Sequence, residues 1–222
     1  MIKEFILGNA ITKNIKGEQL SEKDITFIEK LQNKKNILIQ DKMRLIRLVY
    51  KQSLLLSNAP IVALGMTMQF VIESAYGSAV SGKFNYGGIK EFNPELPRTK
   101  VRTIEKNLTE NTLNFYKNNK LLINQYKDAN GNNVYDVYDF FKDFKSLNEY
   151  LGFKYNLLCT NRYKVVLSSV KLEEYANLIR KCGYATEPSY STIIINTAKY
   201  WNKVFYYNEF GAEQIMLETS NI

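Results

Sequence analysis

The sequence contains no histidine. Catalytic triads of the Ser-His-Asp or Cys-His type, zinc sites with histidine ligands and histidine phosphotransfer all require an imidazole ring. These classes are therefore excluded. Acid–base chemistry in this chain falls to Asp, Glu, Lys, Tyr or Cys side chains.

Cysteine is scarce, and the sequence carries no motif for a cofactor. The chain of 222 residues has two cysteines, Cys159 and Cys182. They are too few for a disulfide scaffold and lack the paired spacing of a zinc or redox site, so we expect two small buried side chains rather than a bridge. The sequence shows no cluster of metal ligands and no glycine-rich phosphate loop, and we expect neither a metal nor a cofactor.

Long hydrophobic runs are also absent. The longest, residues 59–72, is too short to span a bilayer and includes Thr67 and Gln69. Residues 1–7 carry a charge inside their short apolar stretch, which does not suit a signal peptide. We therefore expect no export signal, no membrane anchor and no membrane partner.

Positive charge is in excess. The formal net charge is +8, which suits a polyanionic partner such as nucleic acid or an anionic cell wall. Lysine outnumbers arginine, a bias that an AT-rich genome also produces, and the six arginines are scattered. Because readers of bases and phosphates use arginine forks, we expect an anionic wall rather than nucleic acid as the partner.

The length favours one domain with an appended segment. We expect residues 1–52 to form a mostly helical N-terminal extension with a capping box at Ser21 and Asp24. Residues 53–204 would form the main domain and residues 205–222 a C-terminal tail.

The middle of the main domain changes character. Residues 84–140 are rich in turn residues, and the pair Asn130-Gly131 precedes an aromatic alternation over residues 134–138. This pattern predicts a small β-hairpin lobe. With helical periodicity on both sides of it, the predicted fold class is α+β, mainly helical.

The clearest predicted helix lies just before this lobe. Ser57 or Asn58 can cap it, Pro60 suits its first turn, and Gly77 stands just past Tyr76 as a stop. The segment between these signals is apolar on nearly every side. Such a helix is buried on every side.

Glu73 is the exception, near the C-terminal end of this helix. Burial of the carboxylate and the negative end of the helix dipole would both raise its pKa. A carboxylic acid kept protonated in this way can act as a general acid on a glycosidic oxygen. The alternative is a glutamate that simply reaches solvent at the helix terminus.

Four segments resemble one enzyme family. Residues 73–78 read ESAYGS and residues 84–90 read FNYGGIK, where the family has a helix ending in E-S-G-W-G and then N-L-F-G-I-K. Residues 141–146, FKDFKS, are similar to its F-R-x-Y-x-S element, and residues 183–190, GYATEPSY, to its G-Y-A-T-D-P-x-Y element. Because all four occur in the same order, residues 53–204 resemble the glucosaminidase family of peptidoglycan hydrolases, glycoside hydrolase family 73, which includes flagellar rod-associated hydrolases.

The resemblance implies a fold and an activity. The fold is a lysozyme-like domain with a groove between a helical body and a β lobe, and the activity is hydrolysis of the β-1,4 bond after N-acetylglucosamine in the glycan strands of peptidoglycan. The family's acid glutamate corresponds to Glu73 and its essential tyrosine to Tyr184, whose alternative role is an aromatic wall that stacks on sugar. The sequence departs from the family at Tyr76, where Trp is usual, and at Gly87, where Phe is usual.

A second carboxylate is less well defined. The family often has a Glu in the β lobe shortly before the F-R-x-Y element, and Asp128 occupies a similar place. As a general base Asp128 would activate water and invert the anomeric centre, with Glu91 and Asp136 as alternative bases. The other possibility is that Asp128 has no catalytic role and simply starts the turn at Asn130. A third route uses the 2-acetamido group of the substrate and needs no second protein carboxylate.

Further substrate-binding residues are expected inside the motif segments. Tyr76, Tyr86 and Tyr190 could contact sugar, whereas most of the 16 tyrosines belong to the core or the ordinary surface. Asn85 either bonds an acetamido group or shapes its own loop.

The predicted setting is a phage-encoded lysin, either virion-associated or released from the host cytoplasm to the cell wall by a separate holin. Residues 1–52 would then contact other virion proteins. The alternatives are a lytic transglycosylase or muramidase on the same fold, or a non-catalytic phage structural protein with a degenerate glycosidase fold.

Overall fold

The computed structural model describes residues 20–185 and 187–210. Residues 1–19 of the predicted extension and residues 211–222 of the predicted tail lie outside the described part. The chain divides into two compact units, which we call the helical unit and the sheet unit. The sheet unit comprises Val80–Ser146, and the other described residues belong to the helical unit.

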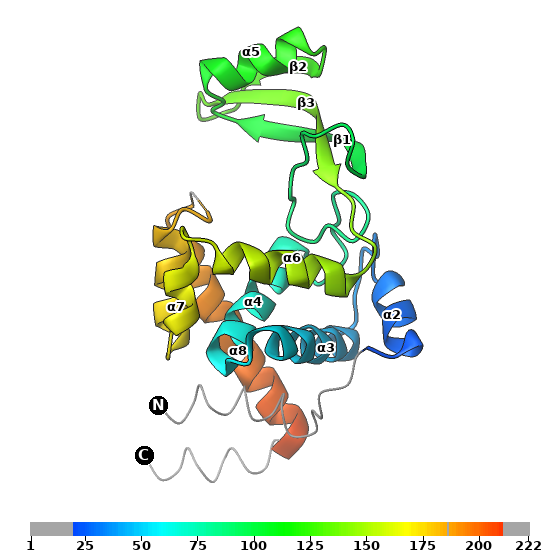
Figure 1. Cartoon of the computed structure of the whole chain (residues 1–222), viewed down its shortest axis with the longest axis vertical. Helices are drawn as coiled ribbons and strands as arrows, with labels where there is room; N and C mark the ends of the chain where they lie inside the picture. The colour runs from blue at the N-terminus through cyan, green and yellow to red at the C-terminus, as the bar shows by residue number, and fades with distance from the viewer. Residues whose placement is uncertain (1–19, 186, 211–222) are drawn as a thin grey trace. The chain divides into compact units, whose positions relative to one another are not determined.

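The helical unit contains the helices on both sides of the sheet unit in sequence (Figure 1). Its elements are α2 (Glu22–Glu29), α3 (Ile39–Ser57), α4 (Pro60–Glu73), α6 (Leu147–Cys159), the short 3-10 helix η1 (Lys164–Ser168), α7 (Leu172–Lys181) and α8 (Tyr190–Phe210). None of the helices in the described residues has the length and apolar character needed to cross a bilayer.

The start of α2 confirms the predicted capping box. The Ser21 side chain accepts from the backbone N–H of Asp24, and the Asp24 side chain accepts from the backbone N–H of Ser21. Further along, α3 continues through residue 52 and ends at Asn58, which adopts a left-handed conformation. The boundary at residues 52 and 53 therefore falls within a helix, and the separate extension stays a prediction.

The ends of α4 differ from the prediction. Its N-cap is Ala59, without a side-chain hydrogen bond, because Asn58 closes α3 and the Ser57 hydroxyl accepts from the backbone N–H of Ala59. Pro60 occupies the first turn as expected. The helix ends at Glu73 rather than at Tyr76.

The early end of α4 has a local cause. The Ser74 hydroxyl donates to the carbonyl of Phe70 at 2.6 Å and accepts from the backbone N–H of Gly77 at 2.8 Å. Ala75 and Tyr76 have φ angles of 45° and 61°, in the left-handed region. The chain thus turns immediately after Glu73, which leaves this carboxylate on the last residue of the helix.

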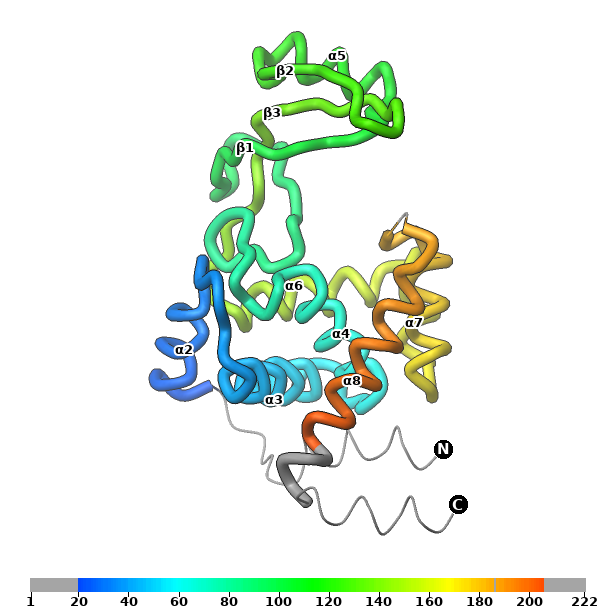
Figure 2. Tube along the Cα trace, turned by 180° about the vertical axis from the view of Figure 1, so that it is seen from behind, coloured from blue at the N-terminus to red at the C-terminus, as the bar shows by residue number. Residues whose placement is uncertain are grey.

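Helix α4 lies at the centre of the helical unit, as the burial of its residues requires. It packs against α3, α7 and α8 (Figures 1 and 2), and the rings of Phe70 on α4 and Tyr150 on α6 meet edge to face at 6.3 Å. Every residue from Val62 to Val71 is buried. This burial confirms the sequence prediction.

The sheet unit confirms the predicted β lobe and enlarges it. Strands β1 (Arg98–Lys106), β2 (Leu122–Lys127) and β3 (Asn133–Lys142) form an antiparallel sheet in the order β1-β3-β2. The β2–β3 hairpin contains the predicted Asn130-Gly131 turn. Helix α5 (Glu110–Asn118) contributes Tyr116 to a core with residues of β3 and of the segment before β2: Leu121, Tyr135 and Val137.

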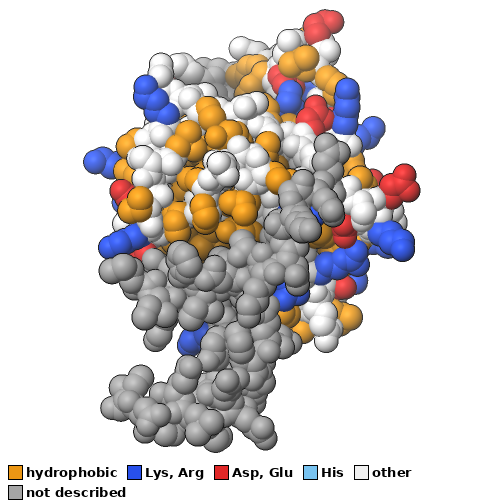
Figure 3. Space-filling view, turned by 60° about the horizontal axis from the view of Figure 1, so that its bottom comes forward, with side chains coloured by type: hydrophobic (Ala, Val, Ile, Leu, Met, Phe, Trp, Pro, Cys, Tyr) orange, Lys and Arg blue, Asp and Glu red, His pale blue; other side chains and the backbone are white. Residues whose placement is uncertain are grey.

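Exposed side chains of the helical unit include apolar ones. Leu55 and Leu56 on α3 and Ile193 on α8 are exposed, and Figure 3 shows hydrophobic side chains gathered on one face of the molecule with Lys and Arg side chains near its edges.

Both cysteines are free. Cys159 is exposed, because it is the last residue of α6, so the prediction that it is buried is wrong.

A glycine inside α4 makes the packing testable. A Cβ atom added at Gly65 would overlap the ring of the buried Tyr175, whereas one at Gly152 in α6 meets nothing within 4 Å. We expect Gly65→Ala to lower the free energy of unfolding by about 1–3 kcal/mol. The matched change Gly152→Ala should raise it by up to about 1 kcal/mol, because alanine favours a helix. Urea denaturation measures both, and equal effects at the two positions would contradict the close packing of α4 against Tyr175.

Candidate active site

The carboxylate of Glu73 accepts hydrogen bonds on both of its oxygens. Tyr190 donates to Oε1 at 2.6 Å, and Tyr184 donates to Oε2 at 3.1 Å. The carboxylate comes from the last residue of α4, Tyr184 follows α7, and Tyr190 is the first residue of α8. Three segments that are distant in sequence therefore meet at one carboxylate.

The segment between α7 and α8 positions both tyrosines. Gly183 has a φ angle of 79°, a left-handed conformation that ends α7 and turns the chain. Arg162 donates to the carbonyl of Cys182 at 2.6 Å and to that of Gly183 at 3.1 Å, which anchors this turn. The rings of Tyr184 and Tyr190 lie 5.9 Å apart.

A second layer of hydrogen bonds holds Tyr190. Gln69, one turn before Glu73 on α4, donates through Nε2 to the Tyr190 hydroxyl at 3.1 Å. Its Oε1 accepts from the hydroxyl of Tyr175 on α7 at 2.7 Å. Both Gln69 and Tyr175 have no exposed side-chain surface. Since Tyr190 accepts from Gln69, its single proton is free to reach Glu73.

Lys154 on α6 completes the cluster, and the sequence analysis missed it. Its Nζ donates to the Tyr184 hydroxyl and lies 3.7 Å from the centre of the Tyr184 ring. The residue is only 2% exposed. Burial lowers the pKa of Lys154 to about 8, and the charge of Glu73 partly opposes this shift. The signal in the sequence was the spacing of Lys154, which lies on the same helical face as Leu147, Leu151 and Leu158.

The tyrosines around Glu73 remain protonated at neutral pH. Burial, and then the negative charge of Glu73, raise the pKa of Tyr184 well above its usual range. The same two causes raise the pKa of Tyr190, and burial raises that of Tyr175. All three hydroxyl groups are therefore donors rather than phenolates.

Tyr76 lies in the helical unit but does not bond Glu73. Its hydroxyl accepts from Nε1 of Trp201 on α8 at 3.2 Å, and the two rings meet edge to face at 5.6 Å. The ammonium of Lys42 lies 4.5 Å from the centre of the Tyr76 ring. Tyr76 is half-buried, and its contact with substrate stays a prediction.

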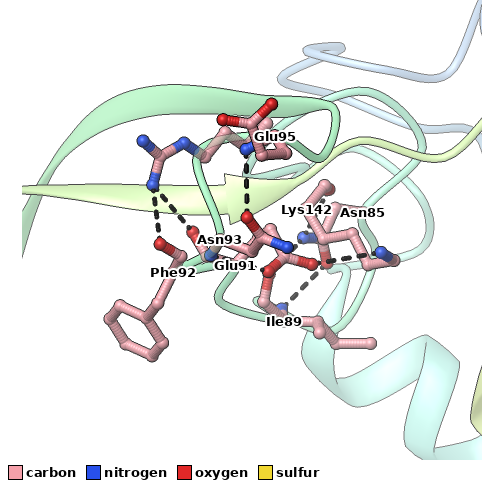
Figure 4. A network of polar contacts seen from close by, with 8 residues as sticks. Asn85, Ile89, Glu91, Phe92, Asn93, Glu95 and Lys142 are labelled. Atoms are coloured by element: carbon pink, nitrogen blue, oxygen red, sulfur yellow. Dashed lines mark hydrogen bonds and ion pairs between the residues drawn. The ribbon is translucent and has the colours of Figure 1, made fainter.

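Asn85 and Tyr86 belong to the sheet unit and are buried, each 1% exposed. The amide of Asn85 donates to the carbonyls of Ile89 at 2.8 Å and Lys142 at 2.9 Å, and accepts from the N–H of Ile89 at 2.9 Å (Figure 4). Asn85 thus shapes its own loop, which is one of the two roles expected for it. Direct substrate contact by either residue stays a prediction.

Asp128 also lies in the sheet unit, where it organises the hairpin turn. Oδ1 accepts from the backbone N–H groups of Asn130 at 2.9 Å and Asn132 at 3.0 Å, and Oδ2 pairs with Lys106 at 3.2 Å. These hydrogen bonds lower the pKa of Asp128. The turn role that the sequence left open is therefore present, and the general-base role stays a prediction.

The alternative carboxylates are also occupied by partners within the sheet unit. Asp136 accepts from Arg102 at 2.9 Å, and Glu91 pairs with Lys142 at 3.2 Å. Within the described residues, no group of three or more Cys, Asp or Glu side chains is arranged to hold a metal ion. The cluster around Glu73 consists of one carboxylate, two tyrosine donors and a buried amine.

Solved structures show a similar fold in glycoside hydrolase domains. The glycoside hydrolase domain of FlgJ from Salmonella typhimurium is 17% identical, covers 82% of this chain and 99% of its own, and gives a TM-score of 0.51. The catalytic domain of the autolysin Auto from Listeria monocytogenes is 16% identical, covers 83% of this chain and 97% of its own, and gives 0.52. A peptidoglycan hydrolase mutant from Sphingomonas sp. A1 is 16% identical, covers 69% of this chain and 90% of its own, and gives 0.50. These likenesses confirm the expected α+β fold.

The family is defined by sequence. The model of the family Glucosaminidase, described as mannosyl-glycoprotein endo-beta-N-acetylglucosaminidase, matches residues 55–203. The chain therefore belongs to the Glucosaminidase family of glycoside hydrolases. A search of curated proteins finds no match.

The contribution of the buried hydrogen bond between Tyr175 and Gln69 to stability can be measured. Gln69→Leu keeps a similar volume but leaves the Tyr175 hydroxyl without an acceptor, so we expect a loss of about 1–3 kcal/mol in the free energy of unfolding. Thr67→Val is the matched control, because the buried Thr67 hydroxyl only donates to the Ala63 carbonyl of its own helix at 2.7 Å. Its cost should stay under about 1 kcal/mol. Chemical denaturation compares the two, and equal costs would show that Gln69 has no special role.

Proposed function

We propose that this glucosaminidase-family protein hydrolyses the glycan strands of peptidoglycan, with Glu73 as the general acid. One observation carries the residue assignment: Glu73 lies at the end of a buried helix, and a tyrosine hydroxyl stands ready to donate to each of its oxygens once the proton has been transferred. The substrate class is supported by the peptidoglycan hydrolases and the autolysin whose fold the chain shares.

In the proposed reaction, protonated Glu73 gives its proton to the glycosidic oxygen. The bond between this oxygen and the anomeric carbon breaks, and the electron pair of the bond goes to the oxygen. Water then adds its oxygen to the anomeric carbon and releases a proton, so that the net change is the addition of one water molecule. Tyr184 and Tyr190 stabilise the carboxylate that remains on Glu73, and a proton from solvent restores the acid.

A second group must take the proton from the attacking water or replace the water as the first nucleophile. Oδ1 of Asp128 already accepts two backbone hydrogen bonds in its turn. As a base, Asp128 would have to give up these bonds or accept the proton on Oδ2, which pairs with Lys106. The 2-acetamido group of the substrate needs no such rearrangement, because the substrate itself supplies it. Substrate assistance is therefore the route that the contacts within the sheet unit favour.

The setting of the protein remains part of the proposal. A lysin carried by a phage virion, or released to the wall from the host cytoplasm, agrees with a Lys-rich chain of net charge +8 acting on an anionic wall. A role of residues 1–52 in binding other virion proteins is proposed on the same terms.

The acid assignment is tested by Glu73→Gln. Because the amide has no acidic proton to transfer, we expect the rate of clearing of a cell-wall suspension to fall by about 100-fold or more. Glu95→Gln is the matched control, since Glu95 is an exposed carboxylate of the sheet unit, and it should clear at the wild-type rate. A Glu73→Gln variant as fast as wild type would remove Glu73 from the reaction.

The bond that is cleaved is identified by the products. We expect mass spectrometry of digested peptidoglycan to show fragments that end in reducing N-acetylglucosamine. Reducing N-acetylmuramic acid would indicate a muramidase, and anhydro-muropeptides a lytic transglycosylase. Either of these would overturn the proposed bond and leave the family unchanged.

A further inference from the structure

The amine of Lys154 is buried, and its direct contacts among the described residues are with Tyr184. Within residues 20–185 and 187–210, no ion pair is formed by its Nζ, which contacts the hydroxyl and the ring of Tyr184. At 2% exposure, the side chain has little access to water. Burying a cation in this way costs free energy, so its position calls for a compensating interaction.

The donors and acceptors around Tyr184 show how Lys154 interacts with Glu73 through this tyrosine. An ammonium group has donors and no acceptor, so the Tyr184 oxygen must accept from Lys154. The single hydroxyl proton of Tyr184 is then left for Oε2 of Glu73, 3.1 Å away. Lys154 therefore determines which way the Tyr184 hydroxyl points.

We infer that Lys154 is a positioning residue whose ammonium directs the Tyr184 proton to Glu73 and stabilises the carboxylate left when Glu73 has given up its proton. The inference rests on the general-acid role proposed above. Nothing new is oxidised or reduced, and no covalent bond to Lys154 forms. The ammonium keeps its own proton throughout, and its contribution is the charge placed one hydroxyl group away from Glu73.

Lys154 is the cation of the described cluster, and it interacts electrostatically with Glu73. The charge of Glu73 acts on Lys154 and on the three tyrosines of the cluster: Tyr175, Tyr184 and Tyr190. Tyr150, on the same helix as Lys154, interacts with Tyr175 and Tyr184. The tyrosines do not ionise near neutral pH, because burial raises the pKa of Tyr175, Tyr184 and Tyr190. The pKa of Lys154, about 8, leaves this side chain charged below that pH. It is therefore a cation over the acidic and neutral range in which a carboxylic acid can work.

The test compares Lys154→Met and Lys154→Arg by the pH dependence of kcat. Methionine removes the charge, so the carboxylate of Glu73 is no longer stabilised, and the proton is harder to give up. We expect the maximal kcat to fall about tenfold, and the alkaline limb of the profile to move up by about one pH unit. KM should change by less than about twofold, because Lys154 makes no contact with substrate in this account. Arginine keeps the charge and should keep the wild-type limb.

A packing control separates this role from a structural one. Leu158 lies one turn further along α6 and is fully buried. Leu158→Val should lower the melting temperature and leave the position of the alkaline limb unchanged. A Lys154→Met variant with wild-type kcat and limb would overturn the inference, as would a limb shift of the same size in Leu158→Val.

A titration without turnover covers the case in which Lys154→Met does not fold. NMR of the protein labelled with carbon-13 at lysine Cε should show one lysine that titrates near pH 8 and is missing from Lys154→Arg. If every lysine titrated above about pH 9, as unburied lysines do, the inference that Lys154 is a buried ammonium group would be wrong. If Glu73→Gln lost activity while Lys154→Met kept the wild-type kcat and alkaline limb, only this inference would be refuted. A fully active Glu73→Gln variant would refute the proposed function itself.

Discussion

The helical unit depends on the placement of one carboxylate at the end of its most buried helix. Ten successive residues of α4, from Val62 to Val71, are buried, which holds the helix in place, and the Ser74 hydrogen bonds end it at Glu73. The turn formed by Ser74, Ala75 and Tyr76 then carries the chain away. A carboxylate in this position needs donors, and the hydroxyls of Tyr184 and Tyr190 provide one for each oxygen.

This requirement links the packing of the helices to the chemistry. Tyr190 is held by Gln69 and, through it, by Tyr175, whose ring packs directly on Gly65 of α4. The same helices that bury α4 therefore orient its terminal carboxylate. A hydroxyl that already points at the carboxylate needs no reorganisation when negative charge develops there, and this is the condition under which hydrogen bonds lower a barrier.

Patterns that depend on local physics could be predicted from the sequence, and those that depend on tertiary contacts could not. The capping box of α2, the burial of α4 and the hairpin after Asn130-Gly131 all follow from short-range signals. The motif segments also identified Glu73 and Tyr184 as candidates. The end of α4 was placed three residues too late, because the Ser74 hydrogen bonds compete with the helix. Lys154 was missed because it contacts a tyrosine 30 positions away in the chain, and no periodicity reports such a contact.

As a general acid, the carboxyl group of Glu73 must meet the glycosidic oxygen of a bound glycan. A crystal structure of the Glu73→Gln variant with an oligosaccharide from peptidoglycan would show whether it does. We expect the side-chain amide at position 73 about 3 Å from the oxygen between two sugar rings, with Tyr184 and Tyr190 still in contact with the amide. If every glycosidic oxygen of the bound glycan lay out of hydrogen-bond reach of position 73, Glu73 would not be the acid.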